Sequence, residues 1–441
     1  MIVPSFHRFA LVLLLLNPAS LAHADEPAAV KWTLDGAFRK VIVNHPNVLQ
    51  AIARSASAKA QIDVARNAWL PTATFDVNHQ ETTTNSPSVP GTSLAPSPFW
   101  QTSLQSKWVA WDFGKTTANM DAATANATVA EQDLRAAKVQ LWSALAQGWV
   151  AVMAADASLA VYQATVVQLE RQRDAVRLQV AARARPELDL FKSEADVAGA
   201  QGDLLRAEEL ARSQRLALAV ALAEPRIPAG PLTPPVFDVQ AIDASALDND
   251  ARLDELTAAA VQSRPEFASI RAKIESLQLL QRAAERGIRP NVYVSGQANA
   301  AGSDLTSLAF NYGVTVGLSF PLSTVWTQTP LIADAAAQVR AFVASQDAQV
   351  LTLRGQINQA VTSLVQARKR LPVAAAQAGY AEKARDAASL RYKAGAGLYL
   401  DVADAESALL KARLAVIQAE LDVQAAIAQL AYLLGRVEPL Q

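Results

Sequence analysis

The chain has 441 residues, a formal net charge of −1 and no cysteine. A near-zero net charge gives no electrostatic basis for binding nucleic acid. The lack of cysteine excludes disulfides, thiol chemistry, Cys-ligated metals and a lipoprotein anchor. Only 6% of the residues are aromatic, and the chain is rich in alanine, a composition that favours closely packed helices over an ordinary mixed core.

The first predicted element is a secretory signal peptide over residues 1–24. A single arginine, Arg8, precedes a short apolar run, and the small residues Ala22 and Ala24 predict cleavage before Asp25. The apolar run is too short to cross a bilayer, and no other segment approaches about 20 consecutive apolar residues. We therefore expect an exported protein without a transmembrane helix.

The mature chain contains two copies of one unit, which we place at 25–224 and 251–435. Landmarks of the first copy recur in the second at a constant offset: Pro46 with Pro265, and Pro71 with Pro290. Further along, Asp189 recurs as Asp401 at a slightly smaller offset. The seven-residue excess of the first copy is expected in the Thr-, Ser- and Pro-rich loop 81–98. Repeats this long indicate a duplicated structural unit. A Pro-rich linker, 225–250, joins the copies, and a short tail, 436–441, follows the second.

Each copy opens with a helical pattern and continues with two segments in which apolar and polar residues alternate strictly. The four segments are about 71–80, 100–111, 290–299 and 311–322. Their length and their two unlike faces match transmembrane β-strands. A half-buried hairpin of a soluble domain shows the same alternation, but four strands at duplicated positions in an exported chain favour a membrane barrel. Four strands cannot close a conducting barrel, so several chains must combine.

After each strand pair comes a very long helical pattern, at about 115–181 and about 331–393. Such helices would reach on the order of 100 Å, a length that suits a protein bridging the periplasm. We expect Pro372 to kink or loosen the second helix.

Each long helix is expected to turn back at a tip and return as a second helix, so that it forms an antiparallel hairpin. The tips are predicted at about 182–190 and about 391–402. Gly395 and Gly397 supply the permissive backbone that the second turn needs. The fold class predicted is therefore mainly α, with a transmembrane β-barrel and a duplicated helix–strand–strand–helix–helix unit.

The ordered motifs resemble those of the TolC family of outer-membrane efflux proteins. They are Asn44-His45-Pro46, Trp69-Leu70-Pro71, Trp111-Asp112-Phe113-Gly114, Arg391-Tyr392, Leu400-Asp401-Val402 and Leu433-Leu434-Gly435. The resemblance covers nearly the whole mature chain in both repeats. It implies a homotrimer in the outer membrane with a 12-stranded β-barrel, continued by a long periplasmic α-helical barrel. It also implies a periplasmic adaptor and an inner-membrane transporter as partners.

The resemblance also assigns an entrance at the second tip. Asp401 and Asp404 match family aspartates that line the constricted opening. Three residues apart, they share one helix face, and a threefold axis would gather them into acidic rings that favour cations. A compatible alternative is that both act as helix-start residues, with Asp401 as the N-cap. Tyr392 matches a family tyrosine that holds the entrance shut by bonding near Asp189, and the alternative for Tyr392 is a buried hairpin contact.

The sequence departs from the family at two places. Gly397 stands where the family has an arginine that can lock the entrance. The first tip lacks a glycine and carries Arg183 and Arg185. We hypothesise that these arginines replace the lock by pairing with Asp401 or Asp404 of a neighbouring hairpin. Solvated tip charges or adaptor contacts are the alternative.

Catalytic signatures are absent from the sequence. It has no zinc-protease motif, no nucleophile elbow and no phosphate-binding loop, and only His45 and His79 follow the signal peptide. We expect no enzyme activity, no metal and no cofactor.

The function predicted is a passive exit duct of a tripartite efflux or type I secretion system, with small-molecule efflux slightly favoured. The alternative is a soluble periplasmic coiled-coil adaptor or scaffold. Aromatic residues near the strand ends, such as Trp108 and Phe320, suit a membrane interface, and an adaptor would not need them.

Overall fold

The computed structural model describes residues 32–82, 97–224, 230–235, 250–320, 322 and 324–436. The predicted signal peptide, most of the 81–98 loop, most of the linker and the end of the tail lie outside the described residues.

The elements follow the duplicated order read from the sequence. They are α1 (Leu34–Asn44), α2 (Pro46–Asn67), β1 (Thr72–Thr82), β2 (Ser97–Trp111), α3 (Lys115–Ala181), α4 (Glu187–Ala221), α5 (Asp250–Ser263), α6 (Pro265–Arg286), β3 (Asn291–Gly302), β4 (Ala309–Ser319), α7 (Thr324–Lys393) and α8 (Tyr399–Leu433). Helices α2 and α6 begin and end at the offset that separates the proline landmarks, and α4 and α8 do so at the smaller offset between Asp189 and Asp401. Proline occupies the first turn of α2 and of α6, where its missing N–H costs no helical hydrogen bond.

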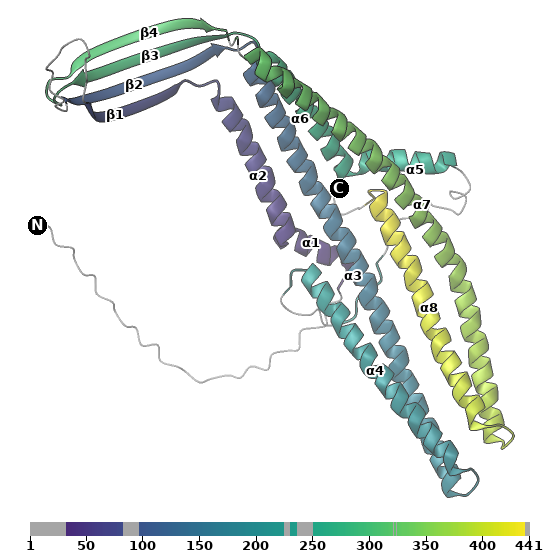
Figure 1. The fold of residues 1–441 in the computed structure, drawn as a ribbon. Helices are drawn as coiled ribbons and strands as arrows, with labels where there is room; N and C mark the ends of the chain where they lie inside the picture. The colour runs from purple at the N-terminus through teal and green to yellow at the C-terminus, as the bar shows by residue number, and fades with distance from the viewer. Residues whose placement is uncertain are drawn as a thin grey trace, which may run out of the picture.

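The four strands form one antiparallel sheet, in the order β1-β2-β3-β4, at one end of an elongated molecule (Figure 1). Strands β1 and β4 are its two edges within the chain. The last pair of the β3–β4 ladder joins Asn291 to Ser319, and the Leu322 N–H then donates to Phe320 O in a turn. Strand β4 therefore ends three residues before the predicted end of that segment.

One face of the sheet is an exposed apolar surface. Five side chains of β4 are between 55% and 81% exposed: Phe310, Tyr312, Val314, Val316 and Leu318. Phe75 and Leu104, which lie opposite each other on β1 and β2, are 68% and 49% exposed. So much exposed apolar surface on one face requires an apolar environment that the single chain does not supply.

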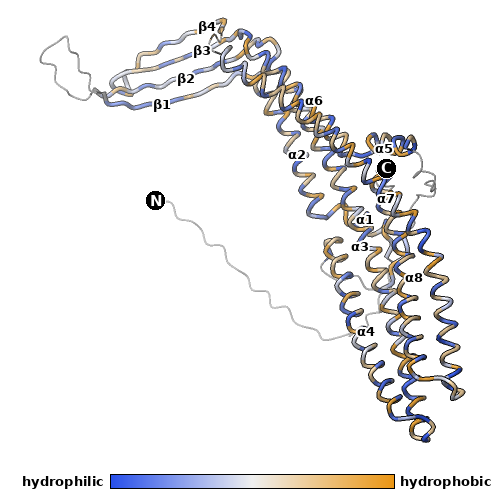
Figure 2. Tube along the Cα trace, turned by 45° about the vertical axis from the view of Figure 1, so that its right-hand side comes forward, coloured by the Kyte–Doolittle hydropathy of each residue, from blue (hydrophilic) through white to orange (hydrophobic). Residues whose placement is uncertain are grey.

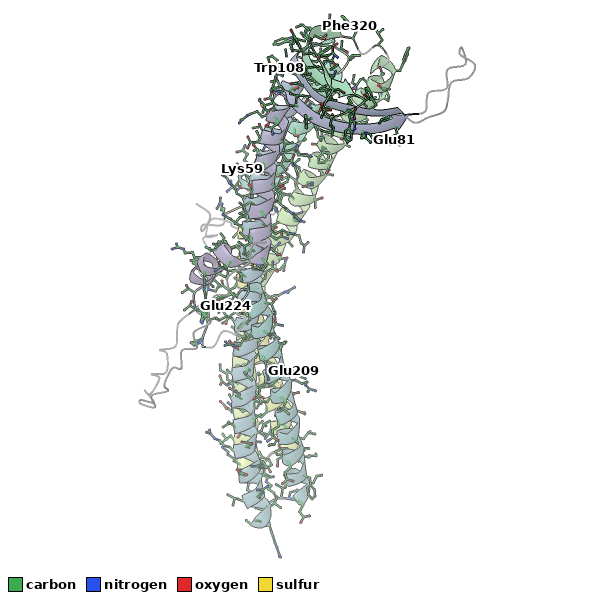
Figure 3. The ribbon with its side chains drawn as sticks, turned by 90° about the vertical axis from the view of Figure 1, so that its left-hand side faces the viewer. Lys59, Glu81, Trp108, Glu209, Glu224 and Phe320 are labelled. Carbon is green, nitrogen blue, oxygen red and sulfur yellow. The ribbon has the colours of Figure 1, made fainter. Side chains whose placement is uncertain are left out.

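Two helical hairpins form the rod that continues from the sheet. Helices α3 and α4 pack along each other, as do α7 and α8, and α2 and α6 lie along the half nearer the sheet (Figures 1 and 3). Helix α3 has 67 residues and therefore reaches about 100 Å. Helix α7 begins at Thr324, earlier than predicted, and runs through Pro330 and Pro372 without ending at either.

Two of the long helices, α3 and α8, contain a stretch that is long and apolar enough to cross a membrane by length and composition. This was not expected from the sequence. The prediction looked for an unbroken apolar run, whereas abundant alanine and valine raise the mean hydropathy between scattered polar residues. Figure 2 shows polar residues interspersed along all the long helices, and α3 is more than twice as long as a bilayer requires.

The main hydrophobic core lies midway along the rod, where the short helices meet the long ones. Trp149 of α3 and Phe38 of α1 are fully buried there, together with Leu430 of α8. The Trp149 Nε1–H donates to Thr233 O at 2.9 Å, and the Thr233 N–H donates to Trp32 O. These bonds fasten the start of the first repeat and the linker that follows it to α3.

Candidate functional site

The two hairpin tips share one backbone geometry. The Ala184 N–H donates to Gln179 O at 2.8 Å, and the Ala396 N–H donates to Arg391 O at 2.9 Å. These six-residue closures are characteristic of Schellman turns, which need one residue in the left-handed conformation. That residue is Gly395 in the second tip (φ 79°) and Arg183 in the first (φ 59°). The first tip therefore makes the same turn without glycine.

Replacing Arg183 by glycine is expected to stabilise the protein. A non-glycine residue in the left-handed region destabilises the folded state by about 1–2 kcal/mol. Glycine removes this strain, but the greater conformational entropy of glycine in the unfolded chain offsets about 0.5–1 kcal/mol of the gain. We expect Arg183→Gly to raise the free energy of unfolding by roughly 0.5–1 kcal/mol, and Gly395→Ala to lower it by about 1 kcal/mol. Thermal unfolding of the purified protein measures both. A destabilised Arg183→Gly would show that the arginine side chain makes a contact worth more than the backbone strain.

Gly397 has a different part in the second tip. Its φ is not in the left-handed region, but a Cβ at this position would lie 3.2 Å from the Tyr392 backbone nitrogen. Glycine therefore eases the close approach of two chain segments here, although Arg185 occupies the equivalent position of the first tip, and Gly395 supplies the left-handed turn.

Two tyrosines of the second hairpin bind two aspartates of the first. The Tyr392 hydroxyl donates to Asp189 Oδ2 at 3.0 Å, as predicted from the family resemblance, and the Tyr399 hydroxyl donates to Asp196 Oδ2 at 2.8 Å. Both tyrosines are buried in a small hydrophobic cluster with Val176 of α3. Sequence reasoning missed the second pair, although each of its members lies seven residues beyond the corresponding member of the first pair.

Burial keeps both tyrosines protonated. Desolvation, followed by the hydrogen bond to Asp189, raises the pKa of Tyr392 to about 12. Desolvation and the hydrogen bond to Asp196 raise the pKa of Tyr399 as well. Both hydroxyls therefore remain hydrogen-bond donors at every physiological pH, and the two hairpins are joined by neutral-to-charged hydrogen bonds.

Arg185 is the third link between the tips. Its guanidinium lies 4.1 Å from the centre of the Tyr392 ring, Nη1 donates to Gly397 O at 3.4 Å, and Nη2 donates to Tyr392 O. Arg185 and Gly397 are separated by the same offset as Asp189 and Asp401, so the two residues hold equivalent positions in the repeat. Within the chain, Arg185 thus binds the backbone of the second tip, whereas the hypothesis paired it with Asp401 or Asp404.

The two predicted entrance aspartates lie on the exposed side of the second tip. Asp401 Oδ2 accepts the Leu398 N–H at 3.4 Å. The N-cap of α8 is Leu398 and Asp401 is the third helical residue, so the alternative that made Asp401 the N-cap is wrong, and Asp401 instead bonds back to the N-cap backbone as in a capping box. Asp404 follows one turn later. A single chain does not bring these two carboxylates to the Tyr392 cluster, so any acidic ring must come from symmetry copies. Within the described ranges, no three His, Asp or Glu side chains could together hold a metal ion.

A buried carboxyl, which was not predicted, lies on α8 beyond Tyr399, on the side away from the tip. Glu406 is 8% exposed, and its Oε1 lies 3.8 Å from Arg385 Nη1, too far for a hydrogen bond. The polar groups around it come from three helices: Gln168 of α3, Glu382, Arg385 and Asp386 of α7, and Arg413 of α8. Burial raises the pKa of Glu406, while Arg385 opposes that shift.

This cluster predicts a pH-dependent stability. The buried Glu406 holds its proton more tightly than it would in the unfolded chain, where its pKa is near 4.5. The stabilisation that the folded protein gains from protonated Glu406 is therefore complete below pH 4.5, and it is lost as the pH rises through the raised pKa. We expect Glu406→Gln to gain stability relative to wild type as the pH goes from 4 to 8. Thermal unfolding across that range tests this, and parallel pH profiles would contradict it.

The fold and the tips together define a class of protein. An apolar sheet face with two unpaired edges belongs in lipid only when further strands close it, and a rod of paired helices continues from one end of that sheet. This arrangement is that of an outer-membrane channel with a helical extension.

Comparison with known proteins agrees with this class. The family model for "outer membrane efflux protein" matches residues 37–224 and 256–436. The chain therefore belongs to the outer membrane efflux protein family. It lies in the outer membrane, its helices extend into the periplasm, and the predicted fold class is confirmed. A search of curated proteins finds no match.

Solved structures of similar fold include three outer-membrane proteins. The Vibrio cholerae outer membrane protein VceC is 19% identical, with a TM-score of 0.75 over 91% of this chain and 96% of its own. The Neisseria gonorrhoeae MtrE channel, solved in its open state, is 21% identical, with a TM-score of 0.75 over 91% and 88%. The Campylobacter jejuni CmeC channel is 15% identical, with a TM-score of 0.76 over 91% and 85%. Identities this low establish the fold alone.

Proposed function

We propose that this chain is the outer-membrane exit duct of a tripartite efflux system and assembles as a homotrimer. The observation that carries the proposal is the four-stranded sheet, whose two edges are unpaired within the chain and whose exposed face is apolar. Three such sheets close a 12-stranded barrel wide enough to leave an aqueous channel, and the hairpins of three chains form the periplasmic tunnel.

The duct is passive and needs partners. No catalytic motif is present in the sequence, so the energy for export comes from an inner-membrane transporter, linked to the helical tips by a periplasmic adaptor. Small molecules are favoured over secreted proteins as cargo, in keeping with the efflux channels that define the family.

The entrance is assigned to the tips. Asp401 and Asp404, repeated around the threefold axis, form acidic rings that favour cations. The Tyr392–Asp189 bond and Arg185 hold the two hairpins of each chain together, and so hold the entrance closed.

Planar-bilayer recording of the detergent-purified trimer tests the proposal. We expect discrete channels that are cation-selective in the wild type and lose that selectivity in Asp401→Ala/Asp404→Ala. A matched control, Glu208→Ala/Glu209→Ala, removes the same charge from an exposed part of α4 far from the tip (Figure 3) and is expected to keep the selectivity. Channels unaffected by the tip variant would reduce both aspartates to helix-start residues. A soluble periplasmic protein that forms no channels would support the adaptor or scaffold instead.

A further inference from the structure

The face of the sheet opposite the apolar one is lined with carboxamides. Residues paired directly across antiparallel strands lie on the same face, and the register gathers six amides in three central rows of this face: Asn78, Gln101, Gln105, Gln297, Asn299 and Asn311. Gln105 lies opposite Gln297, and Asn299 lies opposite Asn311. We call this the amide face.

The charges on the amide face cancel. Among the described strand residues that point to this side, Asp76 is the only acid and Lys107 the only base. Asp76 lies opposite Ser103, four residues before Lys107 on β2, which places the two rows about 13 Å apart. Gln105 lies midway between the two rows, about 7 Å from each, which is within the screening length of about 8 Å at physiological ionic strength, so it experiences the two opposite charges about equally. The Lys107 ammonium also lies against the sheet, 5.5 Å from the centre of the Tyr293 ring.

We propose that the amide face makes the exit barrel a charge-neutral passage, which admits polar organic molecules whether they are cationic, anionic or uncharged. The inference rests on the trimeric duct proposed above, in which this face lines the lumen. Selection by charge is then confined to the periplasmic tips, and the barrel selects by size and hydrogen bonding.

The chemistry of the carboxamide supports this assignment. Each amide carries two N–H donors and a carbonyl acceptor and has no charge at any physiological pH. It can therefore replace water around ammonium, carboxylate or hydroxyl groups alike. Pores that select ions by side-chain charge use rings of one sign, whereas the trimer would present one acidic and one basic ring along this barrel. A duct dedicated to cations would not need the basic ring.

Cysteine labelling tests the local potential directly, because the native chain has no cysteine. Gln105→Cys in outer-membrane vesicles would be reacted with a cationic and an anionic methanethiosulfonate of similar size. The ratio of the two rates would be compared with that of a free thiol. We expect a ratio within about twofold of the free-thiol value, because a potential of even a few kT would change it by about tenfold or more.

Three comparisons make the test decisive. Leu104→Cys, on the opposite face, is expected to react much more slowly with both charged reagents because lipid covers it. Adding Lys107→Gln to Gln105→Cys is expected to favour the cationic reagent, and adding Asp76→Asn is expected to favour the anionic reagent.

A tenfold preference for either reagent in Gln105→Cys alone would overturn the proposal that the exit barrel is neutral. Protection of Gln105→Cys, in a protein that still forms channels, would show that the amide face does not line the lumen. Failure to form any channel would overturn the duct itself, and this inference with it.

Discussion

Replacing Val316 by arginine is expected to prevent assembly of the protein in the outer membrane, whereas arginine at the adjacent Thr315 is expected to be tolerated. Val316 lies on the exposed apolar face of β4 and is 72% exposed. An arginine on the lipid face of a barrel costs about 2–4 kcal/mol at the middle of the bilayer, and the proposed trimer would carry three copies. Thr315 points to the other face, where it lies opposite Ser295, and there the arginine would meet water.

The measurement is the amount of protease-resistant trimer in outer-membrane fractions, quantified by immunoblotting. The two variants introduce the same side chain at neighbouring positions, so differences in expression or in strand propensity are largely matched. Equal loss of trimer in both variants would mean that β4 does not separate lipid from water. Equal tolerance would mean that lipid does not cover the apolar face.

The double variant Arg185→Ala/Tyr392→Phe is expected to open the periplasmic entrance. It removes a hydrogen bond to a carboxylate, worth about 1.5–3 kcal/mol, and a cation–π contact worth about 0.5–2 kcal/mol. A loss of about 3 kcal/mol per chain changes the ratio of closed to open hairpins by roughly a hundredfold. We expect single-channel conductance to rise several-fold. We also expect cells that carry the variant to become sensitive to antibiotics too large for ordinary porins.

The control for this prediction makes the same chemical changes elsewhere on the hairpins. Arg177 forms an exposed ion pair with Glu194, and Tyr380 is 71% exposed, so Arg177→Ala/Tyr380→Phe is expected to leave conductance unchanged. Unaltered conductance in the tip variant would show that contacts between chains, and not the links within each chain, keep the entrance closed.

The general plan of this protein is readable from its sequence because it is encoded by local patterns. Prolines at the starts of α2 and α6, strict alternation in the strands and repeated landmarks at fixed offsets are all properties of short segments. The duplication even predicts that both tips turn alike, although Arg183 replaces glycine in one of them.

The contacts between the hairpins are less accessible to sequence reasoning. Tyr399 and Asp196, like Arg185 and Gly397, lie in different repeats and meet only when two separate hairpins pack together. No local period distinguishes Glu406 from the exposed acids on the same helix, because its burial depends on α3. The contacts that Arg185 makes within the chain were missed for a related reason, while its pairing with Asp401 or Asp404 of a neighbouring hairpin stays a prediction. Charge complementarity pointed to Asp401 and Asp404, whereas the geometry of the tips offers backbone carbonyls.

Pro372 makes α7 easier to bend at one level. It cannot donate to the carbonyl of Arg368, so the helix is most easily bent at this level. Above it, Ile357 and Leu364 are fixed in the main core. Below it, the helix continues to its end at Lys393, an arm of about 32 Å. A bend of about 10° at the proline would therefore carry the tip through roughly 6 Å. A displacement of that size exceeds the reach of the hydrogen bonds that join the two hairpins, so the core can stay rigid while the entrance moves.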